Sequence, residues 1–70
     1  MSQREEIRDW TGKILGYLEE QSNGDVIARA FSGLILGKYD KAFDVTRDFS
    51  GKIVFKGNQA AALVASNKDN

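Results

Sequence analysis

The chain has 70 residues, with ten basic and ten acidic side chains, and it contains neither cysteine nor histidine. This length supports one small domain, and the composition excludes disulfides and the ordinary zinc, copper and haem ligand sets. Balanced charge predicts no general affinity for membranes or nucleic acid. No apolar run approaches the roughly 20 residues that span a bilayer, which predicts a soluble, cytoplasmic protein. No cofactor or metal is expected.

The first segment combines helical and β features. Ser2 followed by Glu5 resembles a capping box, which is typical of a helix start. Gly12 weighs against a helix, because glycine costs roughly 1 kcal/mol in a helix interior. We predict strands at residues 5–10 and 13–20, with an N-terminal helix as the alternative.

A nine-residue pattern starts in this segment and occurs at residues 8–16, 29–37 and 47–55. Each copy has an arginine, an aromatic residue, a hydroxyl residue, a glycine and a branched aliphatic residue at the same places. Val26-Ile27 and Val45-Thr46, which favour strands, precede the second and third copies. If the copies share one conformation, each is a strand–turn–strand unit, and this decides against the helix.

The middle of each copy is expected to be a type I turn that ends in a left-handed glycine and forms a G1 bulge. Aspartate at the first turn position and glycine at the fourth are typical of this turn, and the outer copies have both. The register pairs Asp9 with Lys13, Ala30 with Leu34 and Asp48 with Lys52. Since its pair is apolar, the middle copy is expected at the centre of the sheet.

The remaining chain reads as further strands and a terminal element. Strands are predicted at residues 26–31, 34–40, 44–49 and 52–57. Asn23-Gly24, a strong hairpin signal, lies in the first connection between copies. Residues 59–65 are expected to form a last strand or a short alanine-rich helix, and residues 66–70 to fray. The predicted fold class is all-β: one domain, residues 1–65, forming an antiparallel meander or a short solenoid-like stack.

Adjacent apolar residues occur in the second strand of each unit, at Ile14-Leu15, Ile35-Leu36 and Ile53-Val54. Neighbours in a strand face opposite sides, so these pairs predict apolar groups on both faces of the sheet. Curling of one chain covers one face, and a second chain is expected to cover the other. We therefore predict a homo-oligomer, which also supplements a small core.

Two rows of residues are the candidate interaction sites: the aromatics Trp10, Phe31 and Phe49, and the arginines Arg8, Arg29 and Arg47. We expect the aromatics to fold back as a core or corner ladder, with a subunit interface or a ligand-stacking platform as alternatives. The arginines are expected to pair across strands with acids or to lie over apolar neighbours. Binding of single-stranded nucleic acid by both rows is the alternative function.

No catalytic residue is predicted. Without histidine and cysteine the usual nucleophile–base arrangements are absent. Glu19 and Glu20 are adjacent, so on a strand they face opposite sides. Asp40 and Asp44 flank a turn and could meet, although a solvated turn is the expected outcome. The predicted role is a structural or protein-interaction module that self-associates, and not an enzyme.

The copies, above all residues 45–54 followed by Gly57-Asn58, resemble a class of small bacterial repeat proteins with Asp-x-x-Gly-[Lys/Arg]-x-[Ile/Val]-Gly units. The resemblance covers about residues 7–64. Two positions depart from it, since Ala30 replaces the turn aspartate and Phe55 replaces the final glycine. The resemblance implies a β-repeat fold and a bacterial origin, and it implies no catalytic or ligand residue.

Overall fold

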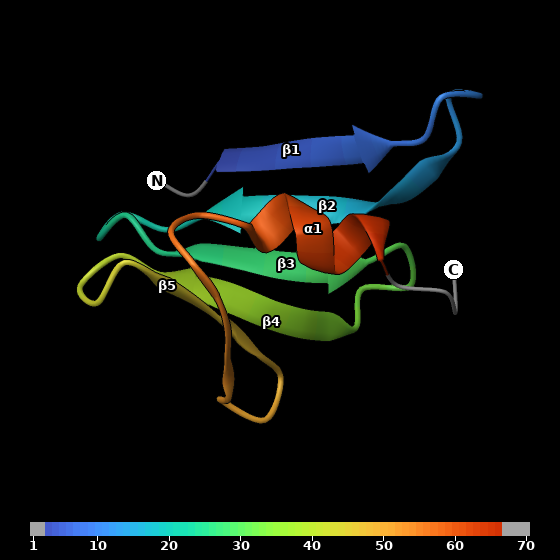
Figure 1. Cartoon of the computed structure of the whole chain (residues 1–70). Helices are drawn as coiled ribbons and strands as arrows, with labels where there is room; N and C mark the ends of the chain where they lie inside the picture. The colour runs from blue at the N-terminus through green and yellow to red at the C-terminus, as the bar shows by residue number, and fades with distance from the viewer. Residues whose placement is uncertain (1–2, 67–70) are drawn as a thin grey trace.

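The computed structural model describes residues 3–66, which form six strands and one helix (Figure 1). The elements are β1 Gln3–Arg8, β2 Ile14–Glu20, β3 Val26–Ala30, β4 Ile35–Asp40, β5 Val45–Asp48, β6 Ile53–Lys56 and α1 Ala60–Ala65. The strands form one antiparallel sheet in chain order. The predicted meander is confirmed, the first segment is two strands, and residues 60–65 are helical.

The strands that lead into the turns of the three copies end earlier than predicted, because those turns begin earlier in the chain. The first strand was predicted at residues 5–10, and β1 instead spans Gln3–Arg8. The carbonyl of Asp9 already accepts a turn hydrogen bond from the Gly12 N–H at 3.0 Å. Residues 9 and 10 therefore belong to the turn. The expected frayed tail lies, apart from Ser66, outside the described residues.

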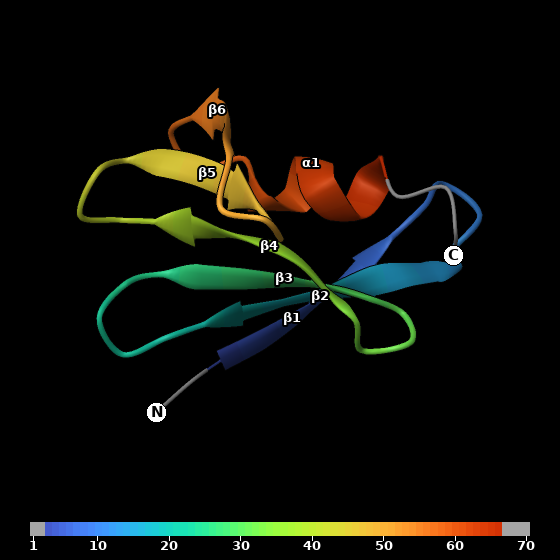
Figure 2. The ribbon, with the colours of Figure 1, turned by 90° about the horizontal axis from the view of Figure 1, so that it is seen from below.

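The sheet is strongly twisted, and α1 lies on one of its faces (Figures 1 and 2). We call this side the helix face and the other side the open face, since within residues 3–66 no helix covers it. The buried core is small and lies between α1 and the sheet. It consists of Val26, Ala28, Ala60 and Val64, with Leu15, Leu18 and Leu36 packed against it.

Two glycines let the helix approach the sheet closely. A Cβ at Gly16 would lie 2.7 Å from Val64 Cγ1, and one at Gly37 would lie 2.7 Å from Leu63 Cδ1. Each glycine also lies against a backbone carbonyl of the following hairpin, that of Arg29 and of Arg47 respectively. Backbone therefore approaches both glycines closely. Any larger residue there would push the helix and the neighbouring strand away.

Phe55 occupies the same place in the third copy, and its surroundings explain the departure from glycine. The helix packs on β1, β2, β3 and β4. Phe55 lies on β6, the last strand of the sheet, and within residues 3–66 no further strand pairs with the outer edge of β6. Its side chain is 40% exposed. With neither helix nor strand above it, this position has room for an aromatic ring.

Thr46 connects the last hairpin to the helix. It is fully buried, and its hydroxyl donates to the Gly57 carbonyl at 2.8 Å and accepts the Gln59 N–H at 3.0 Å. Both bonds are made to the segment that leads from β6 to α1. A buried hydroxyl with both roles filled avoids the cost of an unsatisfied polar group. Thr46 therefore fixes the path of the chain into the helix.

Replacement of Gly16 tests the close approach. Gly16→Ala should lower the free energy of unfolding by about 1–3 kcal/mol, because the new methyl group meets Val64 and the Arg29 carbonyl. Urea unfolding followed by circular dichroism measures the effect. Phe55→Ala is the control at the matching position of the third copy. It should lower the free energy of unfolding by less than truncation of a buried aromatic residue does, because Phe55 is partly exposed. Equal stability of Gly16→Ala and the parent chain would contradict the packing described.

Candidate interaction surface

Three turns with the same geometry lie at one end of the strands. In a meander the connections alternate between two ends, so the turns at residues 9–13, 30–34 and 48–52 share one end, which we call the aromatic end. The glycine N–H bonds to the first turn carbonyl at 3.0, 2.9 and 2.9 Å for Gly12, Gly33 and Gly51. Their φ angles are 90°, 96° and 93°. The predicted turn type and left-handed glycines are confirmed.

The predicted pairing across these turns is also confirmed. The N–H of the first turn residue donates to the carbonyl of its partner in all three copies: Asp9 to Lys13, Ala30 to Leu34 and Asp48 to Lys52. The middle copy contributes β3 and β4, the central strands, as predicted from its apolar pair. Ala30 is buried there, whereas Leu34 is 66% exposed. Only half of that pair therefore contributes to the core.

The three arginines fasten the same turns. Nη1 of Arg8, Arg29 and Arg47 donates to the carbonyl of the turn glycine four residues later, at 2.8, 2.9 and 3.0 Å. We did not predict this bond from the sequence. The constant spacing of four between arginine and glycine was the available signal. Each arginine therefore bonds to the turn of its own copy in addition to its other contacts.

Two of the three arginines also pair with acids across strands, as predicted. Arg29 bonds to Glu19 on the preceding hairpin, and Arg47 Nε lies 3.7 Å from Asp40 Oδ2. Arg8 has no preceding hairpin and pairs with Glu6 on its own strand at 2.7 Å. Partly exposed ion pairs contribute at most about 1 kcal/mol each. Their main effect is to fix the position of the arginine heads on the open face.

The aromatic row is exposed, so the prediction of a core or corner ladder is wrong. Trp10 is 95% exposed, Phe31 58% and Phe49 81%. Each occupies the second position of its turn, which lies beyond the last paired residues of the two strands. On the helix face, α1 already packs against the sheet. Phe31 shares a hollow with Ile14, and Phe49 shares another, of about 230 Å³, with Ile35. The aromatic end is thus an apolar surface open to solvent.

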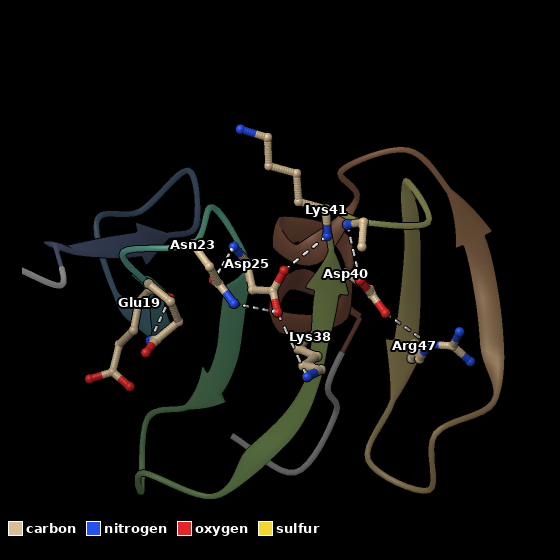
Figure 3. A network of polar contacts seen from close by, with 9 residues as sticks. Glu19, Asn23, Asp25, Lys38, Asp40, Lys41 and Arg47 are labelled. Carbon is tan, nitrogen blue, oxygen red and sulfur yellow. Dashed lines mark hydrogen bonds and ion pairs between the residues drawn. The ribbon is translucent and has the colours of Figure 1, made fainter.

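A polar network occupies the opposite part of the open face (Figure 3). Asp25 joins two turns there, since its Oδ1 accepts the Lys41 N–H at 3.0 Å and its Oδ2 lies 3.8 Å from Lys38 Nζ. Asn23 Nδ2 donates to the same carboxylate at 3.4 Å. Asp25 links the turn after β2 to the turn after β4. No sequence signal pointed to this long-range contact.

The carboxylates of Asp40 and Asp44 do not form a pair with each other. Asp40 accepts the Ala42 N–H at 3.1 Å and faces Arg47, whereas Asp44 accepts the Tyr39 hydroxyl at 2.7 Å. That hydrogen bond raises the pKa of Tyr39 above its usual value. Within residues 3–66 no group of three or more acidic side chains is placed to hold a metal ion.

Comparison with protein-family models, curated proteins and solved structures found no match. The resemblance to bacterial repeat proteins therefore stays a prediction. In the described part of the chain, no helix has the length and apolar character needed to cross a bilayer.

The turn aspartates are held in their charged form. In Asp48 the pKa is lowered by the Ser50 hydroxyl, with further hydrogen bonds from the Lys52 and Ser50 N–H groups. The pKa of Asp9 is lowered in the same way by Thr11 and by the Lys13 and Thr11 N–H groups. A depressed folded pKa means that the carboxylate stabilises the fold above the ordinary pKa of 3.8.

This stabilisation should disappear in acid. As the pH falls from about 5 through the lowered pKa values, the parent chain should lose stability because both carboxylates become protonated. Asp48→Asn keeps an acceptor oxygen but no charge, so its stability should fall less steeply over the same range. Urea midpoints measured at a series of pH values give both slopes. Parallel curves for the two proteins would rule out a stabilising charge at Asp48.

Proposed function

We propose that this chain is a self-associating structural or protein-interaction module that binds through the open face of its sheet. One observation supports this most directly: in residues 3–66 the helix covers a single face, and apolar side chains lie exposed on the other. Ile35 is 46% exposed and Ile53 51%, beside Phe31 and Phe49 at the aromatic end. Large exposed apolar patches on small proteins mark interaction sites.

The composition of the open face fits a protein interface. Aromatic and arginine residues are enriched at such interfaces, and Arg29 and Arg47 lie beside Ile35 and Ile53 in the register of the sheet. The ion pairs hold the arginine heads in place before binding. Less side-chain freedom is therefore lost when a partner docks.

The small core is a second reason to expect association. Only five apolar residues are buried in the described part of the chain. A domain of about this size buries roughly 60% of its unfolded surface, so its stability alone is marginal. Binding of a partner to the folded state stabilises that state by mass action.

Light scattering after size-exclusion chromatography tests the proposal. At micromolar concentration the parent chain should have the mass of a dimer or a larger assembly, and not the 7.8 kDa of a monomer. The double variant Ile35→Thr and Phe49→Ser removes apolar contact from the open face, and it should weaken association roughly 10-fold or more.

Phe55→Ser provides the matched control, since Phe55 is an exposed aromatic on the helix face. Its dissociation constant should equal that of the parent chain. Circular dichroism checks that all variants are folded. A folded parent chain that remains at 7.8 kDa throughout the concentration range would exclude the proposal.

Single-stranded nucleic-acid binding is the second candidate, because the structure brings the arginine and aromatic rows to the same end. Bases stack on exposed aromatics, and arginines contact the phosphates. The single tryptophan, Trp10, reports such stacking by quenching of its fluorescence. Affinity for an oligothymidine should then fall steeply with salt. No quenching at about 50 mM salt would remove this candidate.

A further inference from the structure

The strand register divides the charges of the sheet unequally between its two faces. Side chains alternate along each strand, and the contacts of Gly16, Gly37 and Ala28 with α1 mark which side is the helix face. All basic residues of the strands lie on the open face: Arg4, Arg8, Arg29, Lys38, Arg47 and Lys56. The acidic residues of the strands are divided, with Glu6, Glu19 and Asp40 on the open face and Glu5, Glu20 and Asp48 on the helix face. The chain is neutral overall, but its faces are not.

Ion pairs within the chain compensate only part of this difference. On the open face the pairs are Arg8 with Glu6, Arg29 with Glu19, Lys38 with Asp25 and Arg47 with Asp40. Among residues 3–66, Arg4 and Lys56 form no ion pair, and Arg4 lies over the Tyr17 ring at 4.0 Å. Glu5 and Glu20 on the helix face form none either, and all four of these charged residues are exposed. The open face therefore has an excess of positive charge and the helix face an excess of negative charge.

The outer side of α1 is apolar as well. Its sequence, AAALVA, contains no polar residue, and Ala61 and Ala65 are exposed. A helix with apolar residues all round is typical of a helix that is buried on every side. The open face and the outer side of α1 are thus two uncovered apolar surfaces on opposite sides of the sheet (Figure 2).

A hollow on the helix face has the chemistry to receive a basic side chain. It has a volume of about 210 Å³, and it is lined by Arg4, Glu5, Leu18, Glu20, Val26 and Asn58. The stem of a lysine or arginine packs on apolar residues while its charged head stays at the surface. Leu18 and Val26 offer the apolar contact, and the carboxylates of Glu5 and Glu20 offer the opposite charge. A basic residue from another copy would find both in one place.

We propose that copies stack head to tail, with the open face of one copy on the helix face of the next. This inference rests on the proposed self-association and names the surface that the open face binds. Docking of two open faces would bring the same excess of positive charge together, whereas stacking brings opposite charges together. Since the two contacting surfaces differ, the assembly is a ring or an open stack.

Stacking also covers the apolar surfaces. The outer side of α1 in one copy lies against the exposed Ile35 and Ile53 of another. The chain measures 34 × 26 × 19 Å. Its broad side is comparable with the roughly 800 Å² per partner that stable interfaces bury. Each copy thus supplies the second layer that its neighbour lacks.

Reversal of the unpaired charges tests the arrangement. The variant Arg4→Glu with Lys56→Glu makes the open face acidic, and the variant Glu5→Lys with Glu20→Lys makes the helix face basic. Each variant then has like charge on both faces, so it should associate roughly 10-fold or more weakly than the parent chain. In an equimolar mixture every altered face meets a complementary one, and the affinity of the parent chain should return. Light scattering over a concentration series measures each sample.

The variant Glu5→Lys with Glu20→Lys separates stacking from docking of two open faces. If it associates as tightly as the parent chain, the stacking is overturned and self-association stands. A mixture that does not recover the parent affinity also overturns the stacking. Phe55→Ser remains a control, because Phe55 lies on β6, outside the strands on which α1 packs.

Circular dichroism checks that each variant is folded. If the lysine variant is unfolded, the neutral pair Glu5→Gln with Glu20→Gln replaces it and should still associate more weakly than the parent chain. Unchanged association of a folded neutral pair would then count against the stacking. A parent chain that stays at 7.8 kDa throughout the concentration range defeats the proposed function itself.

Discussion

Val64 and Leu63 of α1 lie over Gly16 and Gly37, and the other features of the domain follow from this contact. A six-residue helix has little surface to bury, so it contributes to the core only if the side chains of the strands beneath it are small. Gly16, Gly37 and Ala28 provide that close contact. Once the helix is docked it covers one face, and the branched residues beside Leu15 and Leu36 are left on the other. The open face is thus a consequence of the short helix.

Local chemistry was sufficient to predict the strands and the turns. Aspartate and glycine at a spacing of three indicate one turn type in the outer copies, at Gly12 and Gly51, and the middle copy, which has Ala30 in place of aspartate, forms the same turn at Gly33. The helix at residues 60–65 was left open against a strand, because short alanine-rich segments have weak preferences. Docking against the glycines decides it, and that is a tertiary effect which the segment's own sequence does not contain.

The exposure and contacts of the surface residues were predicted less accurately than the strands and turns. The aromatic residues were expected inside because large apolar side chains are usually buried. Their place in the turn outweighs that tendency, since the second turn position lies beyond the sheet. The Asp25 network joins residues 16 positions apart, and no periodicity indicates such a contact. The pairing of Arg29 and Arg47 with acids across strands was predicted, whereas the bonds of the arginines to the glycine carbonyls were not.

The position of α1 also divides the sheet by local stability. The helix packs on β1–β4, while the β5–β6 hairpin depends on its strand pairing with β4 and on the Thr46 hydroxyl. Segments with few buried apolar contacts open at the lowest free energy. The amide hydrogens of the β5–β6 hairpin should therefore exchange with solvent before those of the central strands. Each such opening uncovers the edge of β4, where Gly37 leaves room for the backbone of a neighbouring strand.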